Sequence, residues 1–219
     1  MHGHKMNPMT RPAKQGIPWK WAQHGRNDMV DFVGSELILG GQKSGKSRRA
    51  EALASQWMAA SPQHRAVLIA TGQAWDDEMS ERIARHQTDR MQRVPRMTTV
   101  EEPVALAEAL GRASNPQTMV VIDCLTVWLS NLMMPFDPAQ ALDEASRAIA
   151  LARLCDAVAQ APGPVVLVGN EIGLGVIPIG HLVRRCVDAI GQLNQQLAVT
   201  CQRVTLMVAG LPLTLKGTP

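Results

Sequence analysis

The sequence predicts an α/β protein with a mostly parallel sheet and helices on both of its faces. Short apolar runs of strand length alternate along the chain with longer stretches of helical character, as in strand–helix–strand units. Residues 40–47 read GGQKSGKS, a complete phosphate-binding loop of the form G-x-x-x-x-G-K-[ST]. Together these two observations indicate a P-loop NTPase in which residues 35–219 form one catalytic domain.

The elements can be placed in order along the chain. Strands are expected at the short apolar runs, at 36–40, 66–71, 118–123, 164–169 and 203–209. Helices are expected between them, at 46–60, 76–91, 103–112, 138–160 and 180–199. The phosphate-binding loop therefore lies between the first strand and the first helix, which is the context that its chemistry requires.

In that context the loop amides and the helix N-terminus point at a phosphate group. Lys46 can reach the β- and γ-phosphate oxygens, and the Ser47 hydroxyl can ligate Mg²⁺. Open α/β sheets bind ligands beyond the carboxyl ends of their strands, so polar residues after the other strands are further candidates. These are Thr71, Gly72 and Gln73 after the second strand, Asp123 after the third, and Asn170 and Glu171 after the fourth.

Asp123 ends the apolar run VVID and has two interpretations. It is placed like the Walker B acid, which holds Mg²⁺ directly or through water in P-loop enzymes. Alternatively, its carboxylate caps the helix that follows.

The segment at 76–87, DDEMSERIARHQ, is the most unusual one in the chain. Asp76 can cap a helix there. Helical spacing then places four side chains along adjoining parts of one face: Met79, Arg82, Ile83 and His86. From spacing alone, His86 is an ordinary surface or packing residue, and His64 and His181 are interpreted in the same way.

The charge distribution argues against a nucleic-acid partner. Residues 1–34 hold five Lys or Arg and two Asp, so this segment accounts for the whole net charge of +3 and the remaining chain is neutral. No apolar stretch is long enough to span a membrane, and no signal peptide is expected because the first residues are polar and interrupted by prolines. The four cysteines are scattered without C-x-x-C spacing, which favours buried thiols in a cytoplasmic protein.

Residues 1–34 are expected to form a disordered extension. His2 and His4 could instead bind a metal, although a flexible terminus is the better interpretation. Trp19 and Trp21 leave open a segment that docks on the domain.

Several segments together resemble one family: GGQKSGKSRRAE, IATGQAWDDEMSERIARHQ, TTVEEP, VVIDCLTVWLSNLM, GNEIGLGVIP, LNQQLA and VAGLPLTLK. They are similar to the bifunctional adenosylcobinamide kinases and adenosylcobinamide-phosphate guanylyltransferases of cobalamin biosynthesis. The resemblance runs from about residue 36 to residue 216. It implies a RecA-like P-loop fold and a homotrimer.

The resemblance also implies two reactions. ATP or GTP would donate its γ-phosphoryl group to the aminopropanol hydroxyl of adenosylcobinamide. GMP from GTP would then pass through a guanylylated histidine to adenosylcobinamide phosphate, giving adenosylcobinamide-GDP. His86 matches that histidine, which replaces the interpretation from spacing, and a neutral imidazole is a suitable nucleophile near pH 7.

The implied site residues fall into three groups. His86 and Lys46 are catalytic, and Ser47 and Asp123 hold Mg²⁺. Glu101 accepts hydrogen bonds from guanine or ribose, or instead caps the helix after Pro103. The implied nucleotide contacts are Gly40, Gly41, Gln42, Lys43, Ser44, Gly45, Lys46, Ser47, Thr71, Gly72, Gln73, Gln87, Thr88, Asp89, Arg90, Glu101 and Asp123.

The chain departs from the family pattern at three positions. Lys43 stands where the family usually has Arg, so a point charge replaces a bidentate fork. Met97 and Thr98 replace a common Trp-Arg pair, which leaves a kinase without transferase activity as an alternative. A nucleotide-driven motor module is a third hypothesis, which the neutral body disfavours. Because the principal residues are retained, an active bifunctional enzyme is expected.

Overall fold

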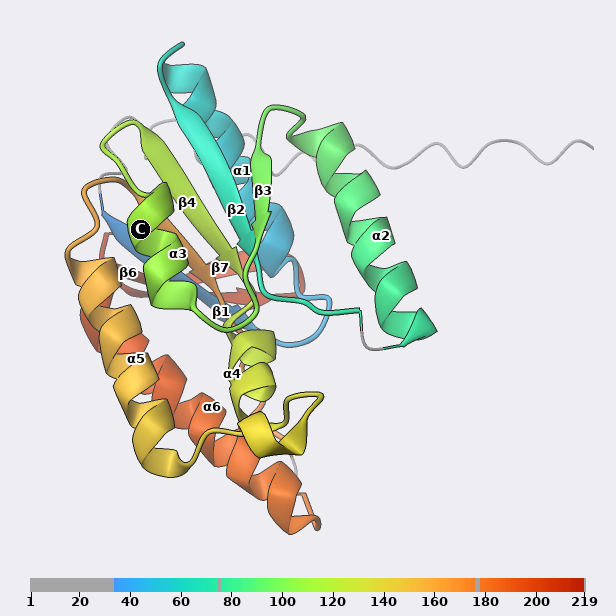
Figure 1. Ribbon diagram of the computed structural model, residues 1–219. Coiled ribbons are helices and arrows are strands. Elements are labelled where there is room, and N and C mark those ends of the chain that lie inside the picture. The colour runs from blue at the N-terminus through green and yellow to red at the C-terminus, as the bar shows by residue number, and fades with distance from the viewer. Residues whose placement is uncertain (1–33, 75, 176–177, 219) are drawn as a thin grey trace, which may run out of the picture.

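The computed structural model describes residues 34–74, 76–175 and 178–218. The expected extension therefore lies outside the described residues, apart from Gly34. The elements in chain order are β1 (Ser35–Gly40), α1 (Lys46–Ala60), β2 (Arg65–Ala70), α2 (Asp77–Arg93), β3 (Thr98–Glu101), α3 (Leu106–Ala113), β4 (Thr118–Asp123), α4 (Leu125–Met133), η2 (Pro138–Gln140), α5 (Glu144–Ala159), β5 (Val165–Val168), α6 (His181–Thr200), β6 (Arg203–Val208) and β7 (Leu211–Lys216) (Figure 1).

The strands form one sheet in the order β3-β2-β4-β5-β1-β6-β7. All neighbouring strands are parallel except β6 and β7, which pair antiparallel. The carboxyl ends of β1, β2, β4 and β5 therefore meet at one edge of the sheet, where the phosphate-binding loop begins. The mostly parallel sheet with helices on both faces that the sequence predicts is confirmed.

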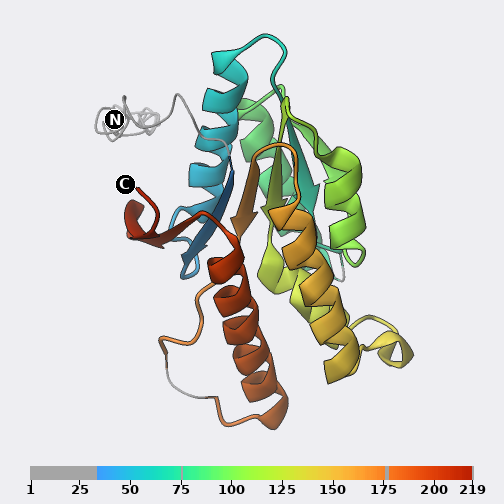
Figure 2. The same cartoon turned by 90° about the vertical axis from the view of Figure 1, so that its left-hand side faces the viewer.

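Helices cover both faces of the sheet, as Figure 2 shows edge-on. On one face α1 packs through Leu53 and Met58 on a cluster that also includes Ile38 and Val166. On the other face α3, α4, α5 and α6 bury a larger cluster. Because β1, β4 and β5 are covered on both sides, each contains a run of at least three consecutive apolar residues, which is why these strands were predictable.

Three elements were missed, and each has a physical reason. The two edge strands, β3 and β7, contain no buried residue, so no apolar run marks them. Pro212 lies within β7, which an edge strand tolerates because one side of its backbone has no partner. The first residues of α4 continue the apolar run of β4, and a short apolar run does not distinguish strand from helix.

The long helix expected at 138–160 was wrong at its start. Pro138 begins a short 3₁₀ turn instead, and α5 starts only after Asp143, whose Oδ1 accepts a hydrogen bond from Ser146 N at 2.8 Å. Hydrogen bonding from the Ser146 side chain, followed by that from its amide, lowers the pKa of Asp143. Asp76 caps α2 as expected, by accepting from Met79 N at 2.7 Å.

A buried carboxylate joins the two elements on either side of the phosphate-binding loop. Glu36 of β1 is 0% exposed and accepts hydrogen bonds from Arg49 of α1 and from Thr205 of β6, each at 2.8 Å. Arg203 lies 3.9 Å from the same carboxylate. Because a buried charge is stable only when it is paired, this cluster fixes β1 against α1.

Within the described part of the chain, no helix combines the length and apolar character that a membrane crossing needs. All four cysteines are free thiols, and Cys201 alone is fully buried. Burial raises the pKa of Cys201 to about 12.

Candidate functional site

The backbone of the phosphate-binding loop requires glycine at two positions. Gly40 has a φ of 152°, and a Cβ there would lie 2.6 Å from both Met207 O and Ser44 Oγ. Gly45 has a φ of 101° and is the N-cap of α1. The turn between β6 and β7 supports the loop, because Gly210 N donates to Ser44 O at 3.0 Å. The amides at the start of α1 are thereby available to an anion.

Lys46 lies at the centre of the charged site and is only 8% exposed. Its ammonium donates a hydrogen bond to Gly41 O at 2.7 Å. Burial lowers the pKa of Lys46, the carboxylate of Asp123 opposes that shift, and the positive charge of Arg82 adds to it. Asp123 at the end of β4 and Arg82 of α2 are therefore both within electrostatic range of the loop lysine.

Asp123 does not cap the following helix. The cap of α4 is Cys124, whose Sγ accepts from Val127 N at 3.4 Å. Within the described residues, neither the Asp123 carboxylate nor the Ser47 hydroxyl makes a hydrogen bond or ion pair. A carboxylate and a hydroxyl are ligands that Mg²⁺ prefers, so the pair fits an ion that is also held by nucleotide phosphates.

Thr71 connects the ends of β2 and β4. Its side chain is fully buried, and its hydroxyl donates to Cys124 O at 2.8 Å and accepts from Cys124 N at 3.0 Å. Asn131 of α4, 4% exposed, donates to Thr71 O at 2.9 Å and to Pro103 O at 3.1 Å. The Thr71 hydroxyl is thus used within the protein, where it fixes the turn that follows Asp123.

His86 lies on α2, which stands at the side of the sheet beyond β3 (Figure 1) and has no buried residue. Ile83 lies over the segment after β2, since a Cβ on Gly72 would be 3.6 Å from Ile83 Cδ1. Arg82 acts on Lys46, and His86 follows it one turn later on the same face. His86 is exposed, and its imidazole makes no hydrogen bond or ion pair within the described residues.

The other described histidines have different surroundings. His64 stacks on Trp57, with ring centroids 3.7 Å apart, and its Nδ1 hydrogen-bonds to Trp57 O at 2.8 Å. This is the packing role that its spacing predicts. His181 is exposed at the first residue of α6.

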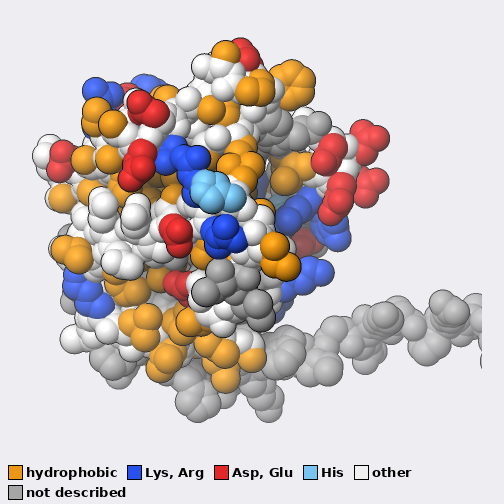
Figure 3. Space-filling model, turned by 90° about the horizontal axis from the view of Figure 1, so that it is seen from below, with side chains coloured by type: hydrophobic (Ala, Val, Ile, Leu, Met, Phe, Trp, Pro, Cys, Tyr) orange, Lys and Arg blue, Asp and Glu red, His pale blue; other side chains and the backbone are white. Residues whose placement is uncertain are grey.

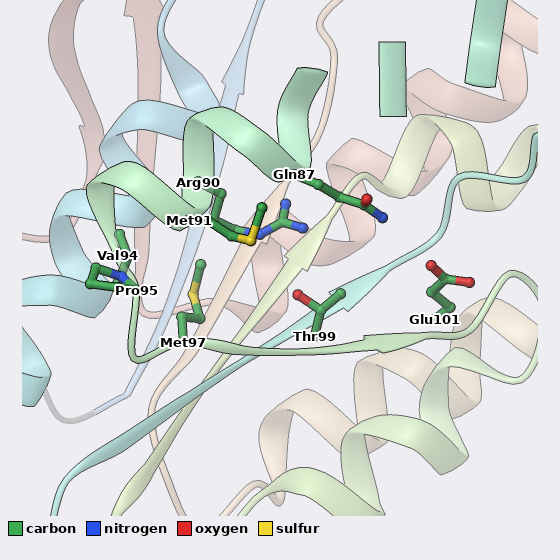
Figure 4. Close-up of a pocket in the computed structure, with 8 residues that line it drawn as sticks. All are labelled: Gln87, Arg90, Met91, Val94, Pro95, Met97, Thr99 and Glu101. Atoms are coloured by element: carbon green, nitrogen blue, oxygen red, sulfur yellow. The ribbon is translucent and has the colours of Figure 1, made fainter. Parts of the chain in front are cut away.

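A cavity of about 310 Å³ lies between the second half of α2 and β3. Figure 4 shows side chains of the helix facing those of the strand across it. The lining residues are Gln87, Arg90, Met91, Val94, Pro95, Met97, Thr99 and Glu101. Four of these residues are apolar and four are polar or charged, a lining that suits a small molecule with both apolar and polar groups.

The cavity brings together three of the predicted nucleotide contacts, Gln87, Arg90 and Glu101. Thr88 and Asp89 do not line it, because their side chains bond within α2. Glu101 does not cap the next helix.

No side chain caps α3, and Glu102 stabilises the turn before it, where its Oε1 accepts from Val104 N at 3.1 Å and from Ala105 N at 2.8 Å. The Glu101 carboxylate is therefore left for the cavity.

The segment after β5 is fixed against the phosphate-binding loop. Glu171 N donates to Gly40 O at 3.1 Å. Asn194 of α6 donates to Asn170 O at 3.1 Å and to Glu171 Oε2 at 3.4 Å. No role was predicted for Asn194 or for Asn131. In the sequence, each of these asparagines lies among the apolar residues of a helical face. An amide side chain in that position is expected to be buried and to hydrogen-bond to the main chain.

Residues 36–215 match the family model of cobinamide kinase / cobinamide phosphate guanyltransferase. The chain belongs to this family. Its relatives in the family include the bifunctional adenosylcobalamin biosynthesis protein CobP of Pseudomonas aeruginosa, 47% identical over 84% of this chain and 98% of that protein. The corresponding CobU proteins of Escherichia coli and Salmonella typhimurium are 37% and 36% identical, over 82% of this chain and 98% of each protein.

The family resemblance expected from the sequence is thereby confirmed, together with the kinase and guanyltransferase activities of the cobinamide kinase family. Among solved structures, the chain is similar to the flagellar accessory protein FlaH of Methanocaldococcus jannaschii. The TM-score is 0.47 at 10% identity, over 84% of this chain and 79% of that one.

Proposed function

We propose that His86 is the residue that accepts GMP in the guanyltransferase reaction. The observation that supports this is the position of His86 on α2. The preceding turn carries Arg82, which acts on Lys46 in the phosphate-binding loop. The next residues, Gln87 and Arg90, line the cavity beside β3. A nucleotide with its triphosphate at the loop and its base in the cavity would pass its α-phosphate near this histidine.

The reaction divides one displacement into two. An imidazole nitrogen of His86 attacks the α-phosphorus of GTP, the bond to the β-phosphate oxygen breaks, and pyrophosphate leaves. A phosphate oxygen of adenosylcobinamide phosphate then attacks the same phosphorus. The phosphorus–nitrogen bond breaks, His86 is regenerated, and the product is adenosylcobinamide-GDP.

The kinase step uses the same loop with a different point of attack. The aminopropanol hydroxyl of adenosylcobinamide attacks the γ-phosphorus of ATP or GTP, loses its proton, and releases the nucleoside diphosphate. Lys46 and the loop amides stabilise the charge that develops on the transferred group. Mg²⁺, when held by Ser47 and Asp123, would supply further positive charge. The Glu101 carboxylate would accept hydrogen bonds from guanine or ribose.

Covalent labelling tests the role of His86. Wild-type protein incubated with α-labelled GTP should retain label that is lost in acid and stable in alkali. His86→Ala should abolish the label while adenosylcobinamide is still phosphorylated, which shows that the loop remains intact. His181→Ala is the matched control, because this histidine is also exposed on a helix. A His86→Ala protein that labels like wild type would refute the assignment.

We also propose the trimeric assembly that the resemblance implies. What supports it is the edge strand β7, where Leu211, Leu213 and Leu215 are 54–64% exposed, a face that a second copy would cover. Light scattering of the purified protein tests it, and a monomer at micromolar concentration would contradict it.

The four free cysteines support a cytoplasmic location, which fractionation of cells tests.

A further inference from the structure

An ion pair joins the last turn of α2 to α1. Arg93 of α2 donates a hydrogen bond from Nη1 to Oε2 of Glu51 at 2.7 Å, and the Glu51 side chain is only 10% exposed. Among the residues that the structure describes, no other side chain of α2 makes a hydrogen bond or an ion pair with a different element. The Glu51–Arg93 pair is therefore the specific polar link between this helix and the rest of the domain.

The remainder of α2 has few other attachments. None of its residues is buried, and Met79, Ile83 and Gln87 are only partly covered. In Figure 1 the end of α2 lies beside β3, whereas its beginning stands away from the sheet. Figure 3, which looks from below, shows acidic side chains gathered at the edge of the molecule on that side. Val94, directly after the helix, is 3% exposed and belongs to the core cluster beneath α1. The firmest attachment of α2 is thus its C-terminal end.

Arg93 and His86 lie on the same face of α2. They are seven residues apart, which is nearly two helical turns and about 10 Å along the helix axis. Helical side chains reach about 5–6 Å from the axis, so a rotation of α2 by about 10° would move the imidazole by about 1 Å. A displacement of about 1 Å in a reacting group can lower a rate about 100-fold. A contact that fixes the rotation of the helix at Arg93 therefore fixes the place of His86.

The guanidinium of Arg93 is held at two points. Its Nη1 binds Glu51 on α1, and its Nη2 donates to Asp89 Oδ2 on its own helix at 2.9 Å. The hydrogen bond with Glu51 is the main reason why the pKa of Arg93 is raised. Because the guanidinium is a planar fork, two partners at two of its nitrogens fix its orientation as well as its position. The contact therefore resists rotation of α2.

The other end of the ion pair lies on the helix that follows the phosphate-binding loop. Glu51 comes one turn after Ser47, and α1 begins at Lys46. In the proposed function, these two residues hold the triphosphate and its Mg²⁺. The Glu51–Arg93 pair therefore connects the helix that would hold the phosphates directly to the helix that carries His86.

We propose that Arg93 is a positioning residue for the guanyltransferase reaction. Through Glu51 it holds α2 so that an imidazole nitrogen of His86 can attack the α-phosphorus of GTP while pyrophosphate leaves. Arg93 does not line the cavity between α2 and β3, so its role is to place the nucleophile rather than to bind the nucleotide base. The proposal rests on the role proposed above for His86.

The rate of covalent labelling at saturating α-labelled GTP tests the proposal. Arg93→Met keeps most of the side-chain length and removes the charge, and it should slow labelling about 10–100-fold. The kcat for phosphorylation of adenosylcobinamide at saturating nucleotide should stay at the wild-type value, because that reaction uses the loop and not His86. Arg93→Lys should restore part of the labelling rate, since it keeps the charge but loses the fork.

A double-mutant cycle shows whether the two residues act as a pair. Glu51→Met should also slow labelling, and the double variant Glu51→Met/Arg93→Met should be no slower than the slower single variant. Losses that multiply in the double variant would show that the residues act separately and would overturn the proposal.

Arg153→Met is the matched control. It removes another arginine–glutamate pair between helices, from α5 to Glu108 of α3 on the opposite face of the sheet, and should leave labelling unchanged. Wild-type labelling by Arg93→Met would overturn the proposal. So would an equal loss of labelling and kinase activity, which would indicate general loss of folding.

The His86→Ala protein separates this proposal from the one on which it rests. If His86→Ala still labels, the proposed nucleophile is wrong. If His86→Ala does not label but Arg93→Met labels at the wild-type rate, only the role of Arg93 is wrong.

Discussion

Replacing Glu36 by Leu should destabilise the protein strongly, although residue 36 does not touch the ligand sites. The substitution leaves the fully buried Thr205 hydroxyl without an acceptor, at a cost of about 1–3 kcal/mol. It also removes the charge-assisted hydrogen bonds from Arg49, worth about 1.5–3 kcal/mol. The sum, about 2.5–6 kcal/mol, brackets the roughly 3–5 kcal/mol that is lost when one partner of a buried ion pair is removed.

Thermal unfolding followed by circular dichroism measures this loss. For a domain of this size each kcal/mol shifts Tm by about 2–4 °C, so Glu36→Leu should lower Tm by roughly 10 °C. Glu36→Gln should lower it less, because its amide oxygen still accepts from Thr205. The control is Glu108→Gln, whose exposed pair with Arg153 at 3.8 Å should contribute under about 1 kcal/mol. A Glu36→Leu protein that melts within about 2 °C of wild type would refute the reasoning.

Three further predictions concern the nucleotide site. Gly40→Ala should abolish GTP binding in calorimetry, because the added Cβ would lie 2.6 Å from Met207 O, and retained binding would show that the loop can shift. Thr71→Val should lower the free energy of unfolding in urea by about 1–3 kcal/mol, since it loses both bonds to Cys124 at nearly constant volume. Burial raises the pKa of the Cys124 thiol to about 11, so its alkylation rate, followed by mass spectrometry, should rise about tenfold per pH unit from pH 8 to 10. A plateau below pH 9 would contradict that environment.

The central strands were predictable from sequence because of where they lie in the sheet. β1, β4 and β5 are covered on both faces, and burial on both faces favours consecutive apolar residues, with the paired Glu36 of β1 as an exception. The same argument explains the failure at β3 and β7. An edge strand is defined by the neighbour with which it pairs, and its side chains remain largely in water, so neither composition nor alternation marks it.

The candidate site was predictable to different degrees. The phosphate-binding loop is a local structure, so its eight predicted nucleotide contacts are eight consecutive residues, 40–47. His86 is different, because spacing along a helix does not reveal what the helix faces. Its interpretation came from family resemblance, and the structure adds the position of Arg82 near Lys46. The cavity could not be predicted at all, since it exists only when α2 packs beside the unpredicted β3.

The strand order explains how one triphosphate could serve two reactions. Asp123 ends β4, which has β2 on one side and β5 on the other. The segment after β2 lies under Ile83 of α2, so the proposed histidine approaches from the β2 side. Glu171 follows β5, next to β1 and its loop. The loop is therefore bordered by different segments on its β2 and β5 sides, and the proposed nucleophile His86 belongs to the β2 side. In the proposed scheme, the choice between reactions is set by which phosphorus each nucleophile can reach.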